Sequence, residues 1–197
     1  MKIHHLDFLK IDTQGSELDI LKGSLDLLET ITGIEVEVEF AELYKNQPLF
    51  EEVHTFLKEN KFELFDLKRY YWKRKRQDLG TNKGQLVFGD ALYFRSPEEI
   101  LSIENIGEKK IIRSIYVYLS YGYVDLAKEL LELSKERNLL GAESIKKLDL
   151  LISSLKSKRT LPNFKGKSKI KNILDNFGTK FSSSGAFAGS DNNLGSN

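Results

Sequence analysis

One segment of this 197-residue chain has a strictly alternating pattern, and it constrains the fold more than any other segment. Between residues 34 and 40 the apolar side chains Ile34, Val36, Val38 and Phe40 alternate with glutamates. Successive side chains of a strand point to opposite faces of its sheet, so the pattern predicts a strand with one apolar and one acidic face. Other elements must bury the apolar face, which indicates a layered domain.

Strand-like and helix-like segments alternate through the first hundred residues. Strands are predicted at 6–11, 34–40, 62–67 and 86–95, and helices are predicted to start near Glu17 and at Pro48. This order is typical of an α/β domain with a largely parallel sheet. The extended stretches on either side of the Gly80–Gly84 loop can also pair as antiparallel neighbours.

The composition changes after Arg95. The next sixty residues have helical apolar spacing, which predicts three short helices, and the segments after them are first basic and then rich in Ser, Gly and Asn. The chain therefore divides into an α/β half at 1–96, a helical extension at 97–155, a basic linker with a short helix at 156–181 and a disordered tail at 182–197.

Composition excludes several classes of function. The 30 Lys and Arg nearly cancel the 29 Asp and Glu, so no attraction of the whole molecule to nucleic acid is expected. With no cysteine and three histidines that lack ligand spacing, no disulfide scaffold and no metal site are expected. No apolar run is long enough to span a bilayer and the first residues lack a signal-peptide pattern, so we expect a cytoplasmic protein without a membrane partner.

Polar side chains gather at the ends of two predicted strands. Lys10 and Asp12 share one face of the first strand, and the glutamates of 34–40 share one face of the next. If these strands are neighbours, Lys10 can pair with one of the glutamates. Spacing alone leaves two interpretations open, which are a face exposed to water and a polar pocket floor at the sheet edge where ligands bind.

A run of charged residues and glycines lies between residues 7 and 23. It contains, in order, Asp7, Lys10, Ile11, Asp12, Gly15, Glu17, Leu21 and Gly23. This spacing resembles the signature D-x-x-K-I-D-x-E-G-x-E-x-x-x-L-x-G of FkbM-type S-adenosylmethionine-dependent methyltransferases. The resemblance continues at 34–40, where Glu37 takes the place of a family glutamate, and at 43–50, 62–67 and 90–95. One departure is Gln14, where the family usually has an acid.

The resemblance implies a partial class I methyltransferase sheet, which is Rossmann-like, with strands four to seven present. The family's glycine-rich loop for the cofactor and its acid for the ribose have no counterpart before Asp7. We therefore expect the C-terminal half of a methyltransferase domain, which a missing N-terminal half or a partner chain would complete. The chain alone is expected to bind S-adenosylmethionine weakly or not at all.

The resemblance also implies a function, namely methyl transfer from S-adenosylmethionine to a hydroxyl of a small molecule or glycan. Asp12 is then the first candidate for the base or hydroxyl anchor, and Glu37 for a pocket residue that is oriented by pairing with Lys10. On the cofactor side the candidates are Asp12, Gly15 in the turn and Glu17 at the helix start.

A basic, aromatic segment from Lys68 to Arg76 has three interpretations. It can be a solvated hairpin arm, a wall that binds sugars or phosphorylated substrates, or a single-strand nucleic-acid surface, which we expect least. The competing function, of a different class, is a non-catalytic remnant or partner-binding module that uses the helical extension and this basic arm.

Overall fold

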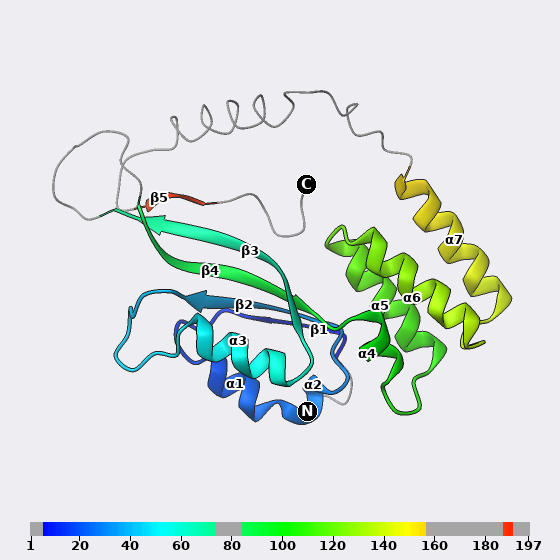
Figure 1. The fold of residues 1–197 in the computed structure, drawn as a ribbon, viewed down its shortest axis with the longest axis horizontal. Coiled ribbons are helices and arrows are strands. Elements are labelled where there is room, and N and C mark those ends of the chain that lie inside the picture. The colour runs from blue at the N-terminus through cyan, green and yellow to red at the C-terminus, as the bar shows by residue number, and fades with distance from the viewer. Residues whose placement is uncertain (1–5, 74–83, 157–186, 191–197) are drawn as a thin grey trace, which may run out of the picture.

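A computed structural model describes residues 6–73, 84–156 and 187–190 (Figure 1). Its strands form one sheet in the order β1-β2-β4-β3-β5. They are β1 (Phe8–Ile11), β2 (Gly33–Glu39), β3 (Glu63–Trp72), β4 (Gln85–Phe94) and β5 (Phe187–Ser190). The helices are α1 (Glu17–Gly23), α2 (Leu25–Leu28), α3 (Phe50–Glu59), α4 (Pro97–Leu101), α5 (Glu108–Ser120), α6 (Val124–Glu136) and α7 (Ala142–Lys156).

The described sheet is mixed, so the expectation of a largely parallel sheet is wrong. β1 and β2 are parallel, with Lys10 opposite Glu35, whereas β4 lies antiparallel between β2 and β3. The predicted antiparallel pairing of the stretches on either side of residues 80–84 is confirmed, and it explains the difference, because β4 runs antiparallel to β3 and lies between β3 and β2. The α/β character itself is confirmed.

Helices α1, α2 and α3 cover one face of the sheet (Figure 1). The apolar residues of β2 point to this side, and Ile34, Val36 and Val38 are completely buried there with Leu21 and Leu57 of the helices. Burying an aliphatic side chain of this size contributes about 1.5–3 kcal/mol. The prediction that this segment is a strand with one buried apolar face is therefore confirmed.

The opposite face of the sheet is divided between an apolar and a polar part. On β4, Leu92 and Phe94 pack against the helices that follow residue 96, while Phe88 and Asp90 on the same face line a concavity. The helical extension is thus packed on the end of the sheet, as Figure 1 shows. The polar part of this face adjoins that apolar cluster, and Tyr121 belongs to both.

Helix α5 is attached to the sheet by a polar network. The Asp7 carboxylate accepts hydrogen bonds from Lys110 Nζ at 2.8 Å and from Arg113 Nε at 2.6 Å. Beside it, the hydroxyls of Thr32 and Ser114 lie 2.8 Å apart and are fully buried. This network holds α5, and with it the turn into α6, at one position on the sheet.

Two predictions about the second half of the chain need correction. Within residues 97–156 the structure has four helices rather than three, because Ser96 and Pro97 start a separate short helix in which Ser96 Oγ accepts from the Glu99 amide. The tail predicted to be disordered contains β5, whose backbone pairs with the edge strand β3 at Tyr70–Trp72. Pairing of this kind draws on backbone groups and needs few large side chains. The rest of the tail lies outside the described residues, as does the linker predicted at 156–181 except for Lys156, which ends α7.

Among the helices that the structure describes, none is both long enough and apolar enough to cross a membrane.

The Asp7 network gives a stability prediction. Burial alone would raise the pKa of Asp7, but its ion pairs with Lys110 and Arg113 outweigh burial and lower it. A lowered folded-state pKa stabilises the fold above the unfolded pKa of about 3.9, and this contribution disappears as the pH falls through the folded value. Asp7→Asn should therefore cost about 1–3 kcal/mol at pH 7, because the largely buried Lys110 loses its carboxylate acceptor and keeps only the Thr32 hydroxyl.

Urea unfolding at pH 7 and at pH 2.5 measures this effect, with the exposed Asp26→Asn of α2 as the control. The control should stay within about 0.5 kcal/mol of the wild type. A loss in Asp7→Asn that equals the control, or that persists undiminished at pH 2.5, would contradict the role of this network.

Candidate functional site

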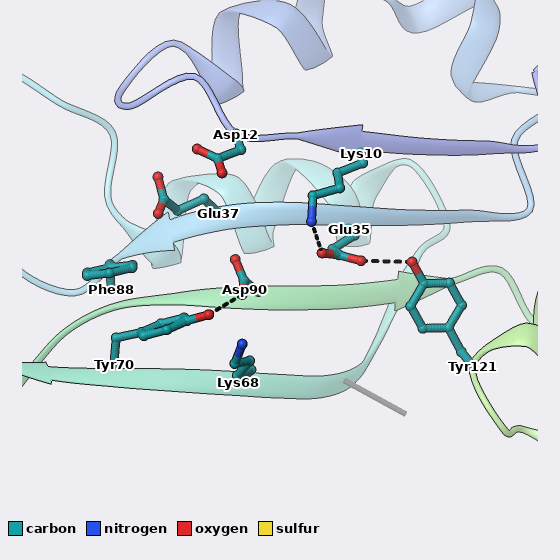
Figure 2. Close-up of a pocket in the computed structure, with 9 residues that line it drawn as sticks. All are labelled: Lys10, Asp12, Glu35, Glu37, Lys68, Tyr70, Phe88, Asp90 and Tyr121. Carbon is teal, nitrogen blue, oxygen red and sulfur yellow. Dashed lines mark hydrogen bonds and ion pairs between the residues drawn. The ribbon is translucent and has the colours of Figure 1, made fainter. Parts of the chain in front are cut away.

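The candidate site lies on the polar part of the sheet, and it extends to the carboxyl ends of β1 and β2. This is the edge where open α/β sheets bind ligands. Side chains from four strands and one helix connection surround a concavity of about 560 Å³. The residues that line it are Lys10, Asp12, Glu35, Glu37, Lys68, Tyr70, Phe88, Asp90 and Tyr121 (Figure 2).

The buried side chain of Glu17 stabilises the turn after β1 by hydrogen bonds. Its carboxylate accepts hydrogen bonds from the Thr13 amide at 2.7 Å, the Thr13 hydroxyl at 2.9 Å and the Gly15 amide at 2.9 Å. Only 2% of Glu17 is exposed, so it is a turn-stabilising residue and does not line the concavity. The structure therefore does not support the prediction that Glu17 binds the cofactor.

Glycine is required at position 15 by the backbone conformation and not by a lack of space for a side chain. Its φ is +116°, a region that other residues rarely adopt, while a Cβ at this position would make ordinary contact with Gln47. The Gly15 amide is occupied by Glu17, and Gly15 is not among the residues that line the concavity. Gly15 shapes the turn, and the structure does not place it in the candidate site.

Lys10 pairs with Glu35 and not with Glu37, so this expectation is wrong. Lys10 Nζ lies 2.6 Å from Glu35 Oε1, and this hydrogen bond raises the pKa of Lys10. The reason is the register, because Lys10 lies directly opposite Glu35 in the parallel pair β1–β2. The second oxygen of Glu35 accepts a 2.7 Å hydrogen bond from the Tyr121 hydroxyl.

Asp12 and Glu37 form the most unusual part of the site. Their carboxylates lie toward one another at the strand ends (Figure 2), and no described residue donates a hydrogen bond to either of them. Burial, followed by the charges of Asp12, Glu39 and Asp90, raises the pKa of Glu37 to about 7. Glu37 is therefore partly protonated at neutral pH, a condition that suits a residue that must both take and give a proton.

Glu39 extends the acidic region toward a second, smaller concavity of about 130 Å³. Its pKa is raised to about 7 by burial and then by Glu17, while the Gln47 amide works against the shift. Glu37 and Phe88 line both concavities, so the two spaces adjoin. Gln14, the departure from the family pattern, lines the smaller one.

An aromatic wall stands beside the carboxylates. The rings of Tyr70 and Phe88 are stacked with centroids 4.6 Å apart, and Trp72 meets Phe88 edge-on at 5.8 Å. The Tyr70 hydroxyl donates to Asp90 at 2.8 Å, and Lys68 Nζ lies 5.0 Å from the centre of the Tyr70 ring. Residues 68–72 of the basic arm thus belong to β3, and residues 74–76 lie outside the described residues.

Sequence reasoning did not choose six residues of this site as candidates, although two of them, Lys68 and Tyr70, lie in the segment that was interpreted as a possible binding wall. Alternation along β3 and β4 could have grouped four of them, which are Lys68, Tyr70, Phe88 and Asp90. Glu35 was on the correct face but was not chosen. Tyr121 had no local signal, because it reaches the site from a turn 86 residues after its partner Glu35.

Within the described residues, no group of three or more His, Asp or Glu side chains has an arrangement that could hold a metal ion.

Comparison with known proteins gives one match. Residues 1–64 match the family model of the methyltransferase FkbM domain, which confirms the suspected resemblance over that part of the chain. The resemblance noted at 90–95 lies outside the matched segment. No curated protein matches the chain. No solved structure matches it either.

The raised pKa of Glu37 gives a prediction about stability. A carboxyl group with a raised folded-state pKa stabilises the fold below the unfolded pKa of about 4.3, and that contribution is lost as the pH rises through the folded value near 7. Glu37→Gln removes the charge that the folded site disfavours. Its melting temperature should therefore exceed that of the wild type at pH 8 and nearly equal it at pH 4.

Thermal unfolding at both pH values tests this prediction, with Glu35→Gln as the matched control on the same strand. The control should be destabilised at pH 8, since Glu35 accepts hydrogen bonds from Lys10 and Tyr121. A Glu37→Gln variant that is less stable than the wild type at pH 8 would show that the Glu37 charge is well accommodated.

Proposed function

We propose that this protein serves in S-adenosylmethionine-dependent methyl transfer to a hydroxyl of a small molecule or glycan, and that the described sheet forms its acceptor site. The match of residues 1–64 to the methyltransferase FkbM domain supports the reaction class. The observation that carries the proposal is the Asp12–Glu37 pair, which faces a concavity at the carboxyl edge of the sheet without a described hydrogen-bond donor.

Glu37 is the better candidate for the base. An acceptor hydroxyl that lies between the two carboxylates would donate its hydrogen bond to one of them, and Glu37, whose pKa is raised to about 7, would accept the proton. Asp12 then anchors the acceptor, and its charge is one reason that the Glu37 pKa is raised. This reverses the roles that the sequence suggested for the two residues.

The lining supports a neutral, hydroxyl-rich acceptor. Four carboxylates and two lysines line the larger concavity, a balance that disfavours a phosphorylated substrate. Carboxylates accept hydrogen bonds from hydroxyls, and the wall of Tyr70 and Phe88 offers apolar surface to a ring. Binding sites for small molecules commonly combine an apolar wall with a few polar groups in this way.

The described residues fit the acceptor better than the methyl donor. S-adenosylmethionine, when bound, supplies the methyl group. The glycine turn after β1 offers no free cradle, because the Thr13 and Gly15 amides are occupied by Glu17. We propose that another segment or a partner chain supplies the donor site, and that β1 to β4 correspond to strands four to seven of a class I methyltransferase sheet.

The cytoplasm remains our proposal for the location, on the basis of the cysteine-free composition. The alternative of a non-catalytic partner-binding module is less well supported, because helices α5 and α6 bury their apolar faces in one cluster with Leu92 and Phe94 of β4.

Methyl transfer by the protein as it occurs in its native cells tests the proposal. The tagged chain is isolated with any chain that accompanies it, and transfer of a tritiated methyl group to neutral and phosphorylated sugars is measured. Glu37→Gln should lower turnover by about 10²- to 10⁴-fold, as expected for loss of a general base. Asp12→Asn should lower turnover and also shift the rising limb of its pH profile to lower pH, because one cause of the raised Glu37 pKa is removed.

The exposed Glu51→Gln of α3 is the control, and it should keep wild-type turnover. Full methyl transfer by Glu37→Gln would exclude Glu37 as the base. In a separate titration calorimetry experiment the recombinant chain alone should bind S-adenosylmethionine weakly or not at all. Micromolar binding there would instead place the donor site within this chain.

A further inference from the structure

Tyr121 connects the helical extension to the candidate site. It follows the last residue of α5, and its ring stacks on Phe8 of β1 with centroids 5.0 Å apart. From this position its hydroxyl reaches the polar part of the sheet and donates to Glu35 Oε2 at 2.7 Å (Figure 2). One residue of the helical extension thus lines the concavity beside eight residues of the strands and strand ends.

Glu35 links Tyr121 to Lys10 by a hydrogen bond to each of them. The Glu35 side chain is only 12% exposed, whereas that of Lys10 is 62% exposed and projects into the concavity. One Glu35 oxygen is held by Tyr121 and the other holds the Lys10 ammonium at 2.6 Å. The carboxylate therefore cannot rotate away from Lys10 without breaking its bond to Tyr121.

Helix α5, which precedes Tyr121, is itself fixed on the sheet. Lys110 and Arg113 of α5 bond to Asp7, the residue directly before β1, and Ser114 bonds to Thr32. The Tyr121 ring also meets Phe94 edge-on at 5.8 Å. Tyr121 is thus held at both its ring and its hydroxyl, which suits a residue whose task is to orient another.

We propose that Tyr121 is a positioning residue of the acceptor site: through Glu35 it holds the Lys10 ammonium over the concavity, where that ammonium binds an oxygen of the acceptor. An ammonium group has three N–H donors, and Glu35 uses one of them. The two that remain suit a ligand oxygen next to the reacting hydroxyl, as in a vicinal diol. This inference rests on the proposed function, and it makes the helices after residue 96 part of the site.

The first test measures Lys10 itself and needs no methyl transfer. Recombinant chain is treated with limiting acetic anhydride, and labelling of Lys10 is compared with that of the exposed Lys58 by mass spectrometry. Tyr121→Phe keeps the ring and removes only the hydroxyl, so Lys10 should be labelled about two- to tenfold faster, the change expected for loss of one hydrogen bond. Glu35→Gln should raise labelling at least as much.

The matched control is Tyr116→Phe, which changes an exposed tyrosine of α5, and in this variant Lys10 should be labelled at the wild-type rate. A wild-type rate in Tyr121→Phe would overturn the positioning role, whatever becomes of the methyltransferase proposal. If Tyr121 had only a structural role, Tyr121→Phe would have a lower melting temperature than the wild type, but the labelling rate of Lys10 relative to Lys58 would not change.

The second test uses the protein from native cells and its acceptor. Tyr121→Phe should raise KM for the acceptor by about two- to tenfold and leave kcat close to the wild-type value, because Lys10 binds the acceptor and does not take the proton. If labelling of Lys10 rises but KM stays unchanged, Tyr121 holds Lys10 without serving the acceptor site, and this inference is wrong.

Discussion

Burial of the apolar face of β2 is the constraint on which the rest of the structure depends. Ile34, Val36 and Val38 are fully buried over α1 and α3, and the period of two then sends every glutamate of the strand to the other face. A shift of one residue in register would bury the glutamates and expose the aliphatic side chains, at a cost of several kcal/mol for each unpaired charge. The acidic face is therefore fixed by the hydrophobic core beneath it.

Some carboxylates of the acidic face have hydrogen-bond donors among the described residues and others do not, and this difference defines the site. Glu35 has Lys10 and Tyr121 as partners, and Asp90 has Tyr70. Asp12 directly follows β1 and Glu37 lies near the end of β2, and there the pKa of Glu37 rises because burial and like charges are not offset by a cation among the described residues. Proteins keep such unfavourable groups mainly where they are used, so the uncompensated pair is the natural centre of a functional proposal.

The sequence predicted the elements better than their arrangement. Alternation identified β2, the glycine turn placed the start of α1, and the motif around Asp7 pointed to a family that residues 1–64 then matched. Register and insertion of β4 are properties of the whole sheet, so neither the Lys10–Glu35 pair nor the mixed topology could be predicted from local spacing. Tyr121 was out of reach for the same reason, since tertiary packing alone brings it to β1 and β2.

The central claim is that Glu37 titrates near neutral pH because the fold buries it beside other carboxylates, whose charges no cation among the described residues offsets. Carbon-13 NMR titration of the side-chain carboxyl groups, with the Glu37 signal assigned by its loss in Glu37→Gln, measures this directly. The structure predicts a midpoint near 7 for Glu37 and a lower one in Asp12→Asn. A midpoint close to the ordinary glutamate value of about 4.3 would contradict the account.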